Sequence, residues 1–277
     1  MRYLQIFNLA PDMHAILFPI FVKIEKRIRM LIATGIITAI MLISTFFFFD
    51  KSIYVLPILL LVTVFCTYFS LLEGIEKIEW FTLFIMPVLA VTALYFFYFL
   101  FPVRWLTRLP FIIFFGISVY ANLLVSNIFN VGVEKSLQLY RAAFSVNYFY
   151  QTLLLFIISN LIFSLKFSFF TNGLLFFGVV GILAIQLLWS IKLDQHIEKR
   201  VLRYSLLVGW VIVQASILIS FVPLQSTISA LVLSSGYYAI GGLVYLYLDS
   251  RLFKEIIREY VFVLIFILCV VLLSISW

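Results

Sequence analysis

The run SFFTNGLLFFGVVGILAIQLLWSI, residues 168–191, decides the fold class of this chain. It contains no charged residue, and it is longer than the about 20 apolar residues that a helix needs to cross a bilayer. Barrel strands would instead be segments of about ten residues with alternating polarity. Comparable apolar runs recur along the chain, so the sequence predicts nine spanning helices. They lie at approximately residues 30–49, 52–72, 80–101, 110–130, 142–165, 168–191, 204–222, 226–248 and 260–277.

The overall composition supports the same fold class. Hydrophobic residues make up 65% of the 277 residues and charged residues 11%, whereas a soluble domain has about 45–50% and about 25%. These values exclude soluble, disordered and disulfide-stapled proteins. We therefore predict an all-α, polytopic transmembrane bundle with the lipid bilayer as its surroundings. An eight-span version, in which the last run does not cross, stays open.

The chain divides into two predicted parts. Residues 1–29 contain Pro11 and Pro19, and their charges follow the apolar stretch, which is the reverse of a secretory signal. We interpret them as an interfacial N-terminal segment. Residues 30–277 are predicted to form a single transmembrane domain.

The positions of the basic residues predict the orientation. Lys and Arg near span ends are retained on the cytoplasmic side of a membrane. With the N-terminus inside, 15 of the 19 basic residues fall on that side. The four on the outside are Lys51, Arg104, Arg108 and Lys166. The sequence thus predicts a cytoplasmic N-terminus. Arg104 and Arg108 are expected to reach lipid headgroups from a short interfacial turn or, in the alternative, to contact an external anion or lipid phosphate.

Several kinds of chemistry are disfavoured by what the spans contain. All 12 acidic residues fall at the edges of apolar runs or between them, whereas ion-coupled carriers usually keep an ionisable group at membrane depth. His14 and His196 are far apart in the sequence, and Cys66 and Cys269 lie inside apolar runs. There is no HExxH pair, P-loop or GxGxxG. We expect no metal, no other cofactor and no nucleic-acid partner.

One polar stripe stands out between the fourth and fifth predicted spans. On a continuous helix its members would share one narrow face. They are Asn127, Asn130, Glu134, Gln138 and Arg141. In one interpretation, an amphipathic helix at the inner membrane surface shows this stripe to water and headgroups. In the other, the stripe turns inward and lines a cavity or partner groove, with Glu134, Gln138 and Arg141 as a hydrogen-bonded core.

Further polar residues within the spans are mainly amides. Such groups commonly form hydrogen bonds between helices, so we interpret them as packing contacts. They are Asn122, Asn147, Gln151, Asn160, Asn172, Gln186 and Gln214.

The segment that contains the stripe also carries a resemblance. EKSLQLYRAAFSVNYFYQTLLLF, with its QLYRAA core and the aromatic, amide-rich span that follows, resembles a family of uncharacterised multi-pass membrane proteins from small-genome bacteria. The resemblance covers roughly residues 122–190. It implies a bacterial inner membrane and directs attention to the stripe, but it implies no activity.

Three functional hypotheses follow from these observations. The first is a non-enzymatic assembly or scaffold subunit that binds a protein partner through its helices or cytoplasmic loops. The second is a transporter or flippase-like carrier that moves an apolar or lipid-linked substrate through a neutral, amide-lined cavity. The third is a membrane enzyme that uses Glu134 and Arg141.

Overall fold

Nine helices make up most of the described chain, and they confirm the prediction of an all-α bundle. The computed structural model describes residues 24–47, 53–72, 80–100, 105–131, 137–194 and 196–274. The helices are α2 (Lys26–Ser44), α4 (Val55–Leu71), α5 (Trp80–Tyr98), α6 (Trp105–Val131), α7 (Leu137–Ser164), α8 (Phe169–Trp189), α9 (Lys199–Ser220), α10 (Ser226–Leu248) and α11 (Lys254–Ser274). Each corresponds to one of the predicted runs. Residues 1–23 of the expected interfacial segment lie outside the described residues.

Eight of the nine described helices are long and apolar enough to cross a membrane. The exception is α4, which is apolar but only 17 residues long. The last run, whose crossing the sequence left open, forms α11 with 21 residues and meets the same criteria. The chain is a multi-span helical membrane protein.

Hydroxyl side chains within the apolar helices donate to the backbone of their own helix. In α4, the Thr63 hydroxyl donates to the Leu59 carbonyl and the Thr67 hydroxyl to the Thr63 carbonyl, both at 2.7 Å. The same pattern joins Ser70 to Cys66 at 2.8 Å. These bonds satisfy polar groups where the surroundings offer no water. That is why threonine and serine are tolerated on the buried face of this helix.

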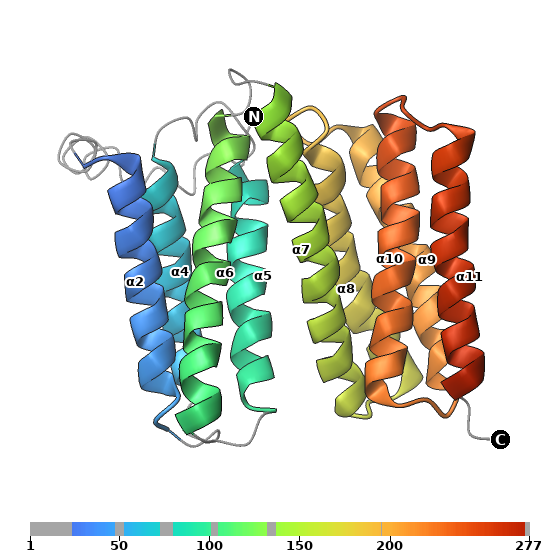
Figure 1. Ribbon diagram of the computed structural model, residues 1–277, viewed down its shortest axis with the longest axis horizontal. Helices are drawn as coiled ribbons and strands as arrows, with labels where there is room; N and C mark the ends of the chain where they lie inside the picture. The colour runs from blue at the N-terminus through green and yellow to red at the C-terminus, as the bar shows by residue number, and fades with distance from the viewer. Residues whose placement is uncertain are drawn as a thin grey trace, which may run out of the picture.

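The helices form two groups that stand side by side (Figure 1). One group contains α2, α4, α5 and α6, and the other contains α7 to α11. They meet where α5 and α6 contact α7, and where α5 contacts α8. The link between α6 and α7 is therefore also the link between the two groups.

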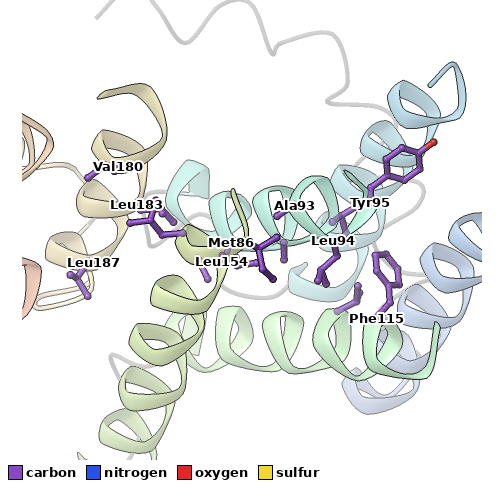
Figure 2. Packing of buried hydrophobic residues seen from close by; sticks show 14 of the residues in the cluster. Met86, Ala93, Leu94, Tyr95, Phe115, Leu154, Val180, Leu183 and Leu187 are labelled. Atoms are coloured by element: carbon purple, nitrogen blue, oxygen red, sulfur yellow. The ribbon is translucent and has the colours of Figure 1, made fainter. Parts of the chain in front are cut away.

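Buried apolar side chains are continuous across this junction. Met86 of α5, Leu154 of α7 and Leu183 of α8 belong to one cluster and are at most 1% exposed (Figure 2). Tyr95 of α5 and Phe115 of α6 extend the same cluster into the first group. The hydrophobic core thus holds the two groups together as one bundle.

Charged side chains gather at one end of the bundle. Of the 13 Lys and Arg residues in the described part of the chain, 11 lie where α2, α7, α9 and α11 begin, at the top of Figure 1. We call this the basic end. The two at the opposite end are Arg108 and Lys166. The structure therefore separates the bases between the two ends in the way that the predicted order of spans requires.

Arg108 does not extend toward headgroups as the sequence led us to expect. Its side chain is buried, and its guanidinium donates to the Thr45 carbonyl at 2.9 Å. The same guanidinium lies 4.6 Å from the centre of the Phe46 ring. Arg108 thus fastens the start of α6 to the end of α2, because the open carbonyls of a helix end accept from a cation. Arg104 lies outside the described residues.

Candidate functional site

The predicted polar stripe is distributed over two helices. Since α6 ends at Val131 and α7 begins at Leu137, Asn127 and Asn130 belong to α6, whereas Gln138 and Arg141 belong to α7. Glu134 lies outside the described residues.

The two asparagines of the stripe face inward. Asn127 and Asn130 are 8% and 4% exposed, and the Asn130 amide donates to the Leu71 carbonyl of α4 at 3.0 Å. One residue before Asn127, the Ser126 hydroxyl donates to the Leu83 carbonyl of α5 at 3.1 Å. These bonds tie the end of α6 to its neighbours in the first group.

The two described stripe residues of α7 are exposed at the basic end. They are Gln138 and Arg141. The asparagines and these two residues therefore lie in different surroundings. That all five stripe residues form one site stays a prediction.

A second polar site lies deeper, between α7, α8 and α10. Asn147 and Gln151 of α7 both donate to the Gln186 side-chain oxygen of α8, the first at 3.0 Å. The Tyr237 hydroxyl of α10 donates to the Gln151 side-chain oxygen at 2.7 Å. None of the four is more than 2% exposed. We call Asn147, Gln151, Gln186 and Tyr237 the amide cluster.

The sequence indicated the three amides of this cluster as polar residues within spans, but not their association. The signal in the sequence is the spacing of four between Asn147 and Gln151, which places both amides on one face of α7. The partner Gln186 lies on another helix, and no sequence pattern links it to α7. Asparagine and glutamine carry donors and acceptors but no titratable proton. The three amides of the cluster therefore suit hydrogen bonding and not proton transfer.

A small cavity lies against the amide cluster at the junction of the two groups. It has a volume of about 10 Å³, and Asn122 and Val125 of α6 and Asn147 and Tyr150 of α7 are among its lining residues. Such a space is near the lower limit for a single water molecule. A bound organic substrate needs a pocket of about 300 Å³ or more.

A group of tyrosines connects α7, α10 and α11 next to the amide cluster. The Tyr148 ring stacks on Tyr238 with centres 5.2 Å apart, and its hydroxyl donates to the Tyr238 carbonyl. Tyr260 of α11 lies 5.4 Å from the Tyr238 ring. A Cβ atom at Gly242 would lie 2.5 Å from the Tyr148 hydroxyl oxygen and still closer to that of Tyr260. Gly242 is therefore the position that lets both hydroxyls reach the backbone of α10.

The loop between α8 and α9 forms a polar cavity at the basic end. Its volume is about 40 Å³, and Lys192, Asp194, His196 and Glu198 are among the residues that line it. The Lys192 ammonium donates to the Glu198 carboxylate at 2.6 Å, and this bond raises the pKa of Lys192. The Trp189 indole donates to the Asp194 carbonyl at 2.9 Å and closes the loop. Both signs of charge are present, so the cavity has no clear preference for an anion or a cation.

Metal-binding geometry is not found in the described part of the chain. No group of three or more His, Cys, Asp or Glu side chains there is placed to hold a metal ion. The candidate sites are thus the neutral amide cluster inside the bundle and the exposed stripe residues at the basic end.

The chain matches a known protein family. Residues 73–274 match the model of a family described as a protein of unknown function, DUF5656. This range takes in α5 to α11 and both candidate sites. No curated protein and no solved structure matches the chain.

Proposed function

The chain belongs to the DUF5656 family, whose function is unknown, and we propose that it acts as a non-enzymatic assembly or scaffold subunit. In this proposal it binds a protein partner in the inner membrane of a bacterium. Residues 30–277 act as one transmembrane domain, and residues 1–29 lie at the membrane surface.

The amide cluster is the observation that supports this proposal best. A carrier with a neutral, amide-lined path would turn its amides toward a substrate. Here Gln186 accepts from Asn147 and Gln151, and Gln151 accepts from Tyr237. Polar groups that bind one another across three helices hold a bundle in a single packed form. A fixed bundle suits a protein that positions a partner.

We place the partner's contact at the basic end, on the stripe residues of α7. The Gln138 and Arg141 side chains are exposed, and an arginine and an amide offer several donors to a partner's carboxylates or carbonyls. Asn127, Asn130 and Glu134 belong to the same proposal as the neighbouring part of the stripe.

Co-purification from native membranes tests the contact. The tagged wild-type chain is expected to retain a protein in fixed stoichiometry, and Gln138→Ala with Arg141→Ala to reduce its recovery by about tenfold, which is about 1.4 kcal/mol of binding. Gln214→Ala with Lys166→Ala is the matched control, because it removes an exposed amide and an exposed base elsewhere. Equal recovery from both double variants, or no stoichiometric protein with the wild type, would contradict the proposal.

The orientation is a separate part of the proposal and has its own test. We propose that the basic end faces the cytoplasm, as the excess of Lys and Arg there favours. In a background with Cys66→Ala and Cys269→Ala, Lys166→Cys is expected to react with an impermeant maleimide in intact cells. Lys199→Cys is expected to react only after the membrane is permeabilised. The reverse pattern of labelling would show the opposite orientation.

The carrier hypothesis has one observation in its favour. The small cavity lined by Asn122, Asn147 and Tyr150 lies where the two helix groups meet, which is the place where a moving bundle would open. A carrier should lose its activity when Asn147→Leu abolishes an amide at this junction, even in a variant that stays folded. A scaffold should keep its partner in the same folded variant.

A further inference from the structure

Helix α5 carries a proline in its interior. Pro87 is the eighth of the 19 residues of this helix, and proline has no backbone N–H. The carbonyl four residues earlier, that of Leu83, therefore receives no hydrogen bond from its usual helical donor. Leu83 is only 1% exposed, so bulk water does not replace that donor. A buried carbonyl of this kind needs a donor from another part of the protein.

Ser126 of α6 supplies the donor. Its hydroxyl lies 3.1 Å from the Leu83 carbonyl oxygen, and its side chain is buried. One turn further along α6, the Asn130 amide donates to the Leu71 carbonyl, which is open because α4 ends there. Residues four apart share one face of a helix, so this face of α6 serves two carbonyls that α4 and α5 leave open. In membranes, serine and threonine side chains commonly satisfy backbone groups that a proline frees.

Pro87 also lies near the boundary between two buried clusters. Before it, Leu83 and Phe84 belong to a second cluster at the basic end, which includes side chains of α6, α7 and α8, Trp189 among them. From Met86 onward, the buried apolar residues of α5 belong to the main cluster that joins the two helix groups (Figure 2). The parts of α5 on the two sides of the proline are therefore packed largely into different clusters.

We propose that Pro87 and Ser126 form a latched hinge in α5. Helices bend most sharply where a proline interrupts the series of backbone bonds, and here the interruption lies beside the boundary between the clusters. The latch is the bond from Ser126, which ties the first turns of α5 to α6. When the latch opens, these turns move relative to the rest of α5 and loosen the second cluster. That cluster lies where the first helix group contacts α7 and α8.

The second cluster connects the hinge to the loop between α8 and α9. Trp189 belongs to this cluster, and its indole donates to the Asp194 carbonyl at 2.9 Å. The hinge is thus joined through packed side chains to the polar cavity at the basic end. The inference does not rest on the proposed function, because the latch opens or stays closed whether or not a partner is bound.

The reactivity of a buried thiol tests the latch. In a Cys66→Ala and Cys269→Ala background, Leu83→Cys places a single thiol just before Pro87. Its rate of reaction with N-ethylmaleimide in the purified full-length protein measures how often this turn opens. Adding Ser126→Ala is expected to raise that rate about tenfold, because the carbonyl at position 83 loses its donor. An unchanged rate would overturn the proposal.

Ser70→Ala is the matched control for this measurement. Ser70 is also buried at the basic end, but its hydroxyl donates to the carbonyl at position 66 of its own helix. That carbonyl accepts a backbone N–H as well, so the substitution leaves it with a donor. We expect a rate within twofold of the parent. A tenfold rise here would show that loss of any buried hydroxyl loosens the turn, which contradicts a specific latch.

Pro87→Ala tests why the latch is needed. Alanine has the N–H that restores the helical bond to the carbonyl at position 83. In this background, Ser126→Ala is expected to change the reaction rate by less than twofold. A tenfold rise with and without Pro87 would show that Ser126 does not act through the carbonyl that the proline frees.

A thiol on the other side of the proline tests the position of the hinge. Leu94 is fully buried in the same helix and belongs to the main cluster. With Leu94→Cys in place of Leu83→Cys, Ser126→Ala is expected to leave the reaction rate within twofold of the parent. An equal rise at both positions, as unfolding of the whole bundle would give, would overturn the hinge.

Discussion

Gln186→Leu is expected to destabilise the bundle by about 2 kcal/mol, because it removes the acceptor that two buried amides share. Asn147 and Gln151 donate to the same Gln186 oxygen, and all three residues are at most 2% exposed. A buried donor left without an acceptor costs about 1–3 kcal/mol. Leucine has a similar size, so the change tests the hydrogen bonds and not the filling of space.

The measurement is the thermal unfolding of the purified protein in detergent, followed by reaction of the buried Cys66 thiol in a Cys269→Ala background. Gln214→Leu is the matched control, since Gln214 is an exposed glutamine within a span and its replacement leaves the amide cluster intact. We expect the control to unfold at the parental temperature or above it. If Gln186→Leu and Gln214→Leu unfold at the same temperature, the amide cluster contributes nothing to stability.

Gly242→Ala is the second change for which we expect a large effect, a loss of about 1–3 kcal/mol from overpacking. The added Cβ would lie 2.5 Å from the Tyr148 hydroxyl oxygen and 2.7 Å from the Cζ atom of Tyr260. Tyr148 would have to move, which weakens its bond to the Tyr238 carbonyl. Tyr260 would have to move as well, and with it α11.

The same substitution at Gly178 is the control, because nothing lies within 4 Å of a Cβ built there. In a helix, alanine is favoured over glycine by about 0.5–1 kcal/mol, so Gly178→Ala is expected to be neutral or stabilising. The cost of Gly242→Ala should shrink when Tyr148→Phe and Tyr260→Phe are already present, as a double-mutant cycle measures. An unchanged cost in that background would place the clash elsewhere.

The helices and their order could be predicted because each span forms a helix independently of the others. A chain segment in lipid must satisfy its own backbone hydrogen bonds, so an apolar run of sufficient length forms a helix wherever it occurs. Residues 168–191 show this: the described helix α8 covers Phe169–Trp189. The ends shift by a few residues because helix termini depend on local bonds, such as the Ser168 side chain that accepts from the Thr171 backbone.

Contacts between helices could not be predicted in the same way. Gln151 is 35 positions from Gln186 and 86 positions from Tyr237. A single sequence gives no information about which side chains meet over such separations. The polar stripe shows the opposite case, in which residues close together in the sequence lie on two different helices. Its residues share one face only on a single continuous helix. In the structure α6 ends at Val131 and α7 begins at Leu137. Arg108 was expected at the headgroups because the sequence contains no sign that the Thr45 carbonyl lies within its reach.

The weak attachment of α11 also has a consequence for the order in which the protein forms. This helix is the last part of the described chain to leave the ribosome, and Ile267 is its one buried residue. The cluster that unites α5, α7, α8 and α10 includes none of its side chains among its fully buried members. The core of the preceding helices is thus complete without α11, and α11 is expected to be the first helix to separate when the fold is disturbed.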